Sequence, residues 1–91
     1  MTTRQRIMDL LGRENLGPTD LSARLDLPVR EILDHLNHVQ KSVRPPLRFL
    51  VEPAGCEKCG FVFKDRRKLR PPGRCPKCKS QSIREQTFRI L

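Results

Sequence analysis

Apolar residues recur at helical spacing through the first half of the chain. The positions concerned are Ile7, Leu10, Leu11, Ile32, Leu36 and Val39. Apolar residues three and four positions apart form one side of an amphipathic helix. Thr2 and Gln5 have the spacing of a capping box, so the first helix is predicted to start there and to be ended by Gly17-Pro18.

A second, shorter helix is predicted over residues 20–25, followed by a tight turn and a longer third helix. Thr19 is a suitable N-cap for the second helix, and Asp26 tolerates the left-handed conformation that a tight turn requires. Pro28 opens the third helix, which ends near Lys41. Two helices joined by a short turn, the second one longer, describe a helix-turn-helix, and a plain three-helix bundle is the alternative.

Two segments after the predicted helices, one directly following them and one made of the last residues, are predicted to be strands. Residues 47–52 alternate loosely, with Leu47, Phe49 and Val51 on one face, and residues 87–91 form the second segment. A terminal strand needs a partner, so we expect the two segments to pair antiparallel as a two-stranded wing after the third helix. The fold class expected is α+β.

The chain of 91 residues is strongly basic, and its excess charge lies in the second half. Lys and Arg number 19 against 10 acidic residues, a net charge of +9. Residues 1–46 carry a net +1, and residues 47–91 carry a net +8. Such a chain favours polyanionic partners such as nucleic acid. Four Phe with no Trp or Tyr argue against a single-strand binder that stacks bases on aromatic side chains.

All four cysteines lie in the basic half, in the pattern C-x2-C-x15-C-x2-C. They are Cys56, Cys59, Cys75 and Cys78. Two C-x2-C pairs at this separation are typical of a tetrahedral zinc site. Gly60 follows the first pair, where a tight knuckle favours a residue without a Cβ, whereas Lys79 stands at the place where zinc ribbons commonly have a second glycine.

Other uses of the cysteines have less support from the sequence. Disulfides suit exported chains, and the first residues do not lead into the apolar stretch of a secretory signal, so a cytoplasmic protein is expected. A dithiol redox enzyme would place one pair at a helix start, whereas Phe61-Val62-Phe63 after Cys59 reads as strand. The same four thiolates also suit iron. Four Cys ligands leave no open position for a catalytic water, so we expect a structural ion and no enzyme activity.

The loop between the two cysteine pairs concentrates positive charge. Its cationic residues are Lys64, Arg66, Arg67, Lys68, Arg70 and Arg74. Six cations near a rigid metal site predict contacts to phosphates, and a merely solvated loop is the alternative. Phe61 and Phe63 are expected to pack the ribbon against the helices.

The exposed side of the third helix offers few groups for reading DNA bases. Arg30 suits guanine and Asn37 suits adenine in a major groove. Glu31 and Asp34 lie on the same helix and would be repelled by phosphates. We therefore expect most of the affinity to come from the ribbon loop and the wing.

The run from Leu21 to Leu27, followed by Ile32 and Leu36, resembles the helix-turn-helix of winged-helix regulators. Together with Pro53 to Phe63 and Arg74 to Lys79, the whole chain resembles predicted prokaryotic transcriptional regulators that join a winged helix-turn-helix to a rubredoxin-like zinc ribbon. The resemblance implies a winged helix-turn-helix over residues 1–53, an inserted zinc ribbon over 54–79 and a return strand over 80–91.

The function expected from these features is zinc-dependent binding of double-stranded DNA in transcription regulation. The alternative is a non-catalytic module that binds protein or RNA through the helical face and the basic ribbon. No membrane span or small-molecule site is evident in the sequence, and a homodimer is compatible with it.

Overall fold

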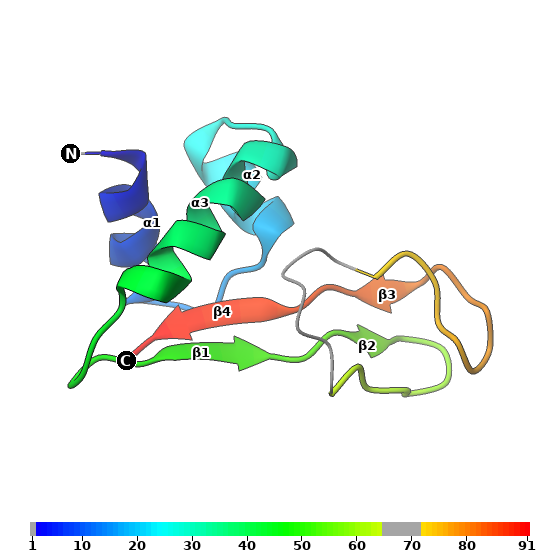
Figure 1. Cartoon of the computed structure of the whole chain (residues 1–91). Coiled ribbons are helices and arrows are strands. Elements are labelled where there is room, and N and C mark those ends of the chain that lie inside the picture. Colours follow the sequence, from blue (N-terminus) through cyan, green and yellow to red (C-terminus); the bar gives the residue numbers. More distant parts are fainter. Residues whose placement is uncertain (1, 65–71) are drawn as a thin grey trace.

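The computed structural model describes residues 2–64 and 72–91, which form a mixed α+β protein. Within these residues, three helices are followed by four short strands in two small antiparallel sheets (Figure 1). The predicted α+β class is confirmed. The elements are α1 (Thr3–Leu11), α2 (Pro18–Leu25), α3 (Val29–Ser42), β1 (Phe49–Glu52), β2 (Gly55–Cys56), β3 (Ile83–Arg84) and β4 (Thr87–Ile90).

Helix α1 begins in the predicted capping box. The Gln5 amide N–H donates to Thr2 Oγ1 at 3.2 Å, and the Thr2 N–H donates to Gln5 Oε1 at 2.9 Å. These bonds satisfy amide groups that the first helical turn leaves without partners. The helix ends at Leu11, with Gly12 as C-cap, so the prediction that Gly17-Pro18 ends it was wrong. The chain leaves the helix early because Leu16 pairs with a strand.

Helix α2 starts at Pro18, two residues earlier than predicted. Gly17 is its N-cap and Pro18 occupies the first turn, where a missing N–H costs nothing. Thr19, predicted as the N-cap, lies inside the helix, and its amide and hydroxyl donate to Glu85 instead. Asp26 ends the helix at φ 55° and ψ 49°, so the predicted left-handed turn residue is confirmed.

Helix α3 carries the apolar stripe that its sequence predicts. Ile32, Leu36 and Val39 are all buried. Pro28 precedes the first turn as N-cap, and the last residue is Ser42, one beyond the predicted end near Lys41. The stripe packs on the same core as α1 and α2.

Strands β1 and β4 pair antiparallel, as predicted, with Phe49 opposite Ile90 and Val51 opposite Phe88. On the other edge of β4, Leu16 and Phe88 exchange two backbone hydrogen bonds of 3.2 and 2.9 Å. The segment between α1 and α2 is thereby tied to the sheet. Leu47, predicted to share one face of the first strand with Phe49 and Val51, lies outside β1 and is 48% exposed.

The apolar core lies between the three helices and one face of this sheet. The Phe49 and Phe88 rings stack at 5.6 Å between centroids. The helices alone would leave the apolar side chains that face the sheet exposed, so β4 completes the core. The buried residues of the core are Ile7, Leu11, Leu16, Leu21, Ile32, Leu36, Val39, Phe88 and Ile90.

The second sheet lies beyond the first and carries the cysteine segment away from the helices (Figure 1). Gly55 lies opposite Arg84, and Cys56 lies opposite Ile83. On the other side of Gly55, Val62 forms a single bridge. The segment predicted to be a strand around Val62 is therefore only a short return.

Phe61 and Phe63 contact each other rather than the helices. Their rings meet edge to face at 5.0 Å between centroids. Neither belongs to the core cluster or to the partly buried residues packed on it. The expectation that they join the ribbon to the helical part was wrong, because the short return keeps both rings within the ribbon. No helix among the described residues has the length and apolarity to cross a bilayer.

Candidate metal centre and basic surface

The first cysteine pair lies on a tight turn that follows β2. The Gly60 N–H donates to the Cys56 carbonyl at 3.0 Å, which folds the turn around Cys59. Gly60 has φ 79°, a conformation that side-chain-bearing residues rarely adopt. A Cβ at this position would meet no atom within 4 Å, so backbone conformation rather than lack of space favours glycine here.

The second pair repeats the same turn. The Lys79 N–H donates to the Cys75 carbonyl at 2.9 Å, and the Cys75 N–H donates to the Ser80 carbonyl at 2.9 Å. Lys79 has φ 61°, so it adopts the left-handed conformation that Gly60 adopts in the first turn. The departure noted in the sequence is therefore a strained lysine in an otherwise equivalent turn.

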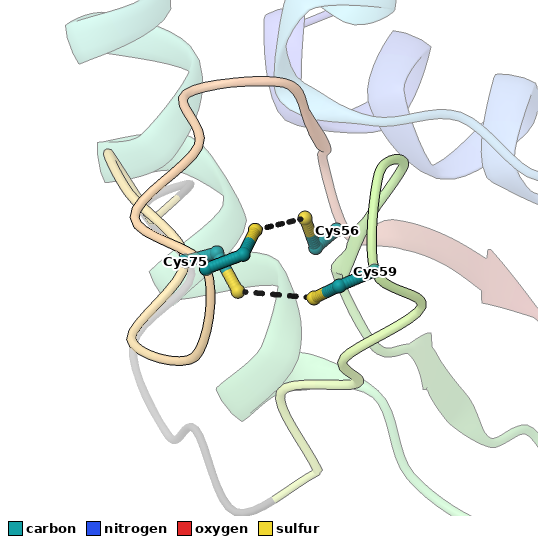
Figure 2. A group of neighbouring side chains, drawn as sticks. Cys56, Cys59 and Cys75 are labelled. Carbon is teal, nitrogen blue, oxygen red and sulfur yellow. Dashed lines mark hydrogen bonds between the residues drawn. The ribbon is translucent and has the colours of Figure 1, made fainter.

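The two turns face each other and bring all four sulfurs together (Figure 2). The Sγ atoms of Cys56 and Cys78 are 3.5 Å apart, and so are those of Cys59 and Cys75. All four lie within 4.8 Å of one another. Sulfurs at ~2.3 Å from a tetrahedral zinc ion are separated by roughly 3.8 Å. The four side chains therefore fit a single zinc ion.

Backbone amides around the cluster favour the thiolate form of two cysteines. The amide of Cys59 donates to Cys56 and, despite opposing burial, helps to lower the pKa of Cys56 to about 6. At Cys75, burial raises the pKa, but hydrogen bonds from the amides of Cys78 and Lys77 outweigh it and the net direction is down. The Lys77 N–H lies 3.4 Å from the Cys75 sulfur. These donors stabilise negative charge on sulfur.

Cys59 behaves oppositely, because it shares the cluster with the other sulfurs. The amide of Phe61 lowers its pKa, but burial and the neighbouring sulfurs together raise the pKa of Cys59 to about 12. Like charges so close cannot all form without a compensating cation. The cluster thus has the donor set and the charge requirement of a metal site.

The cysteines also supply much of the buried surface of the ribbon. Cys56 and Cys75 are buried, whereas Cys59 and Cys78 lie nearer the surface. Outside the helical core, the other buried apolar side chains of the described ribbon are Ala54 and Pro72. So small an apolar cluster is not enough to hold two turns together, and a metal ion bound by the four cysteines would take the place of the missing core.

A carboxylate connects the ribbon to the helices. Glu85, between β3 and β4, accepts from the Thr19 hydroxyl at 2.8 Å and from the Thr19 N–H at 3.1 Å. A Cβ on Gly17 would lie 2.3 Å from a Glu85 carboxylate oxygen, so glycine is needed for this close approach. This contact was not predicted from the sequence. The Gly17-Pro18 pair, which was interpreted only as the end of the first helix, was the signal for it.

The predicted nucleic-acid contacts fall on two separate surfaces. Arg30 and Asn37 are exposed on α3. Lys64 and Arg74 are exposed on the ribbon. The other four predicted contacts, Arg66, Arg67, Lys68 and Arg70, lie outside the described residues.

The ribbon is basic even without those four. None of its exposed described cations forms an ion pair with a described acid. The exposed cations of the described ribbon are Lys58, Lys64, Arg74, Lys77, Lys79 and Arg84. Of these, only Lys64 and Arg74 were predicted as nucleic-acid contacts.

The fold and the site define a three-helix α+β protein with a four-cysteine zinc ribbon. Residues 2–50 match the family described as PF0610-like, N-terminal, and residues 53–91 match the PF0610 rubredoxin-like zinc beta-ribbon domain. The chain belongs to the PF0610-like family. The predicted resemblance to proteins with a rubredoxin-like zinc ribbon is confirmed in that part, and the family match together with the four-cysteine cluster supports a metal site suited to zinc.

One solved structure is similar over nearly the whole chain. It is the solution NMR structure of protein PF0610 from Pyrococcus furiosus, at 36% sequence identity and a TM-score of 0.79. The similarity covers 98% of this chain and 88% of that one. A search of curated proteins found no match.

Proposed function

We propose that this protein binds double-stranded DNA as a transcriptional regulator, with a winged helix-turn-helix as the binding unit. Support comes from the order of its elements. Helices α2 and α3 are joined by a tight left-handed turn at Asp26, and the β1–β4 pair follows α3 as a wing would. The bridge between Leu16 and Phe88 ties the connection before α2 to the same sheet, so helix pair and wing form one body.

The observation that carries the proposal is the free polar face of α3. Arg30 and Asn37 are seven residues apart, about two helical turns, so they lie on one side of the helix. Both are exposed, and neither side chain contacts a described partner by hydrogen bond or ion pair. Arg and Asn are suited to guanine and adenine, respectively, in the major groove.

The ribbon is proposed to supply most of the affinity. Glu31 and Asp34 are exposed on α3 and oppose its approach to phosphates. The unpaired cations of the ribbon, Lys64 and Arg74 among them, are free to contact the DNA backbone. Phosphate contacts of this kind contribute affinity without sequence preference.

The zinc ion is proposed to be structural. Four thiolates fill a tetrahedral coordination shell, so a single ion would have no position for a reacting water, and we propose that the protein is not an enzyme. Iron suits the same ligand set and is the alternative ion. Thiolate ligands require a reducing compartment, which supports a cytoplasmic location.

Duplex binding at several salt concentrations tests the proposal. With four or more phosphate contacts, the affinity of the zinc-loaded chain should fall roughly a hundredfold or more between 50 and 200 mM salt. Lys64→Ala with Arg74→Ala should weaken binding equally on all sequences and reduce the salt slope. Arg30→Ala should change sequence preference, and Arg6→Ala, an exposed arginine on α1, is its control.

Undetectable duplex binding at 50 mM salt would refute the proposal. The acidic residues on α3 favour the second candidate, a module that docks a protein or RNA through this face. In that case Glu31→Gln and Asp34→Asn should weaken capture of the partner, whereas under the DNA proposal they should strengthen duplex binding.

A further inference from the structure

Within the part of the chain that the structure describes, strand β1 has one free edge. Its other edge is paired with β4 over Phe49–Glu52. Among the described residues no strand pairs with the free edge, and Figure 1 shows β1 along the underside of the molecule, with the helices on the opposite side of β4. A free edge offers unpaired amide and carbonyl groups to another strand.

The register identifies which backbone groups face outward. Arg48 and Leu91 exchange two backbone hydrogen bonds of 2.6 and 3.0 Å. Because hydrogen-bonded and non-hydrogen-bonded pairs alternate in antiparallel sheets, Leu50 also points its backbone groups toward β4. The amide and carbonyl groups of Phe49 and Val51 therefore point to the free edge.

The side chains along this edge are apolar in the middle and oppositely charged at the ends. Leu50 is 40% exposed and Val51 is 42% exposed. Arg48 and Glu52 are exposed on the same face as Leu50, since residues two apart share a face of a strand. Arg48 contacts no described acid, and Glu52 has one weak contact, from the Thr87 hydroxyl at 3.4 Å.

We propose that the free edge of β1 pairs with the β1 edge of a second copy of this chain, antiparallel and around a two-fold axis at Leu50. Leu50 then lies opposite Leu50 of the partner subunit. Arg48 lies opposite Glu52 of the partner subunit, and Phe49 lies opposite Val51 of the partner subunit. The outward backbone groups of Phe49 and Val51 meet as hydrogen-bonded pairs, so this register agrees with the alternation already set by β4.

Self-complementarity favours a second copy over an unrelated strand. One register satisfies the outward backbone groups, the apolar centre and both charged ends at once, as a two-fold interface requires. Pro46 and Pro53 border the segment, and proline does not extend a hydrogen-bonded ladder. The contact is therefore short and closes as a dimer. The proposal does not rest on DNA binding.

Sedimentation equilibrium of the zinc-loaded full chain tests the pairing. The contact is small and the net charge of +9 opposes association, so a weak dimer is expected, measured from about 1 μM to about 1 mM chain. Arg48→Glu and Glu52→Arg should each raise Kd roughly tenfold or more, because two-fold symmetry turns two attractive pairs into two repulsive ones. The double variant R48E/E52R restores both pairs and should recover the wild-type Kd.

Controls separate the edge from general charge effects. Arg6→Glu and Glu31→Arg make the same changes in net charge on helices α1 and α3. At 0.15 M salt, where exposed charges are screened beyond ~8 Å, each should leave Kd within about twofold of the wild-type value. Val51→Pro removes one outward N–H that β4 does not use and should abolish the dimer while zinc content is retained. A monomer up to about 1 mM, a dimer insensitive to both single reversals, or a double variant that stays monomeric would each overturn the proposal.

Discussion

The helical part and the ribbon of this small protein are stabilised in different ways. Among the described residues, nine buried apolar side chains from the three helices, strand β4 and the connection between α1 and α2 form the core of the helical part. The described ribbon buries little beyond two of its cysteines, Ala54 and Pro72. The first part is held by the hydrophobic effect, whereas the second has the four ligands of a metal ion in place of a large apolar core. The comparison implies that the two parts respond differently to the same perturbation.

Removal of the metal should have the largest effect, and it should affect the ribbon but not the helical part. A chelator with reductant should unfold the ribbon, because metal binding supplies roughly 10 kcal/mol or more of folding free energy in such sites. Helices α1 to α3 should stay folded. Amide NMR spectra recorded before and after verified zinc removal measure both parts, and Cys75→Ser should reproduce the result, with Ser82→Ala as control. Loss of the helical signals together with those of the ribbon would contradict independent stabilisation.

Phe88→Ala should have the converse effect and destabilise the helical part. Phe88 is fully buried between the helices and the sheet, and replacing such a side chain costs about 3–5 kcal/mol. Urea unfolding followed by circular dichroism should show this loss for the helices. Phe61→Ala is the matched control, because Phe61 is only half-buried and lies outside the core. An equal loss of stability in both variants would show that the helical core is not a separate unit.

Glu85→Ala tests how the two parts are joined. The carboxylate accepts from both the hydroxyl and the amide of Thr19, and hydrogen bonds to a charged group contribute about 1.5–3 kcal/mol. Hydrogen exchange at the Thr19 amide should accelerate correspondingly, while zinc affinity stays near wild type. Glu57→Ala, an exposed acid within the ribbon, should leave that exchange rate unchanged. Unaltered exchange in the Glu85 variant would mean that this contact does not hold the ribbon to α2.

The sequence predicted what depends on local pattern and missed what depends on contacts across the fold. Spacing located the four cysteines and the buried stripe of α3, and the need of a terminal strand for a partner predicted the β1–β4 pair. The end of α1 and the start of α2 were misplaced because Leu16 pairs with Phe88 and Glu85 binds Thr19, and both partners lie far along the chain. Such contacts leave no periodic signal in the segments that they fix.

The smallest expected effect concerns the two knuckles, which share a turn but differ in the residue that closes it. Gly60 at φ 79° has no steric cost, whereas Lys79 at φ 61° has the strain of a left-handed L-residue, about 1 kcal/mol or more before the entropic cost of glycine is subtracted. Lys79→Gly should therefore stabilise the zinc-loaded ribbon by about 0.5–1 kcal/mol.

Gly60→Ala should destabilise the ribbon by a similar amount, although a Cβ there touches nothing within 4 Å. Chelator competition at fixed pH measures both changes, and Lys77→Gly, which also removes a ribbon lysine but not a left-handed one, separates strain from charge. If Lys79→Gly and Lys77→Gly weaken zinc binding equally, the two knuckles are not distinguished by backbone strain.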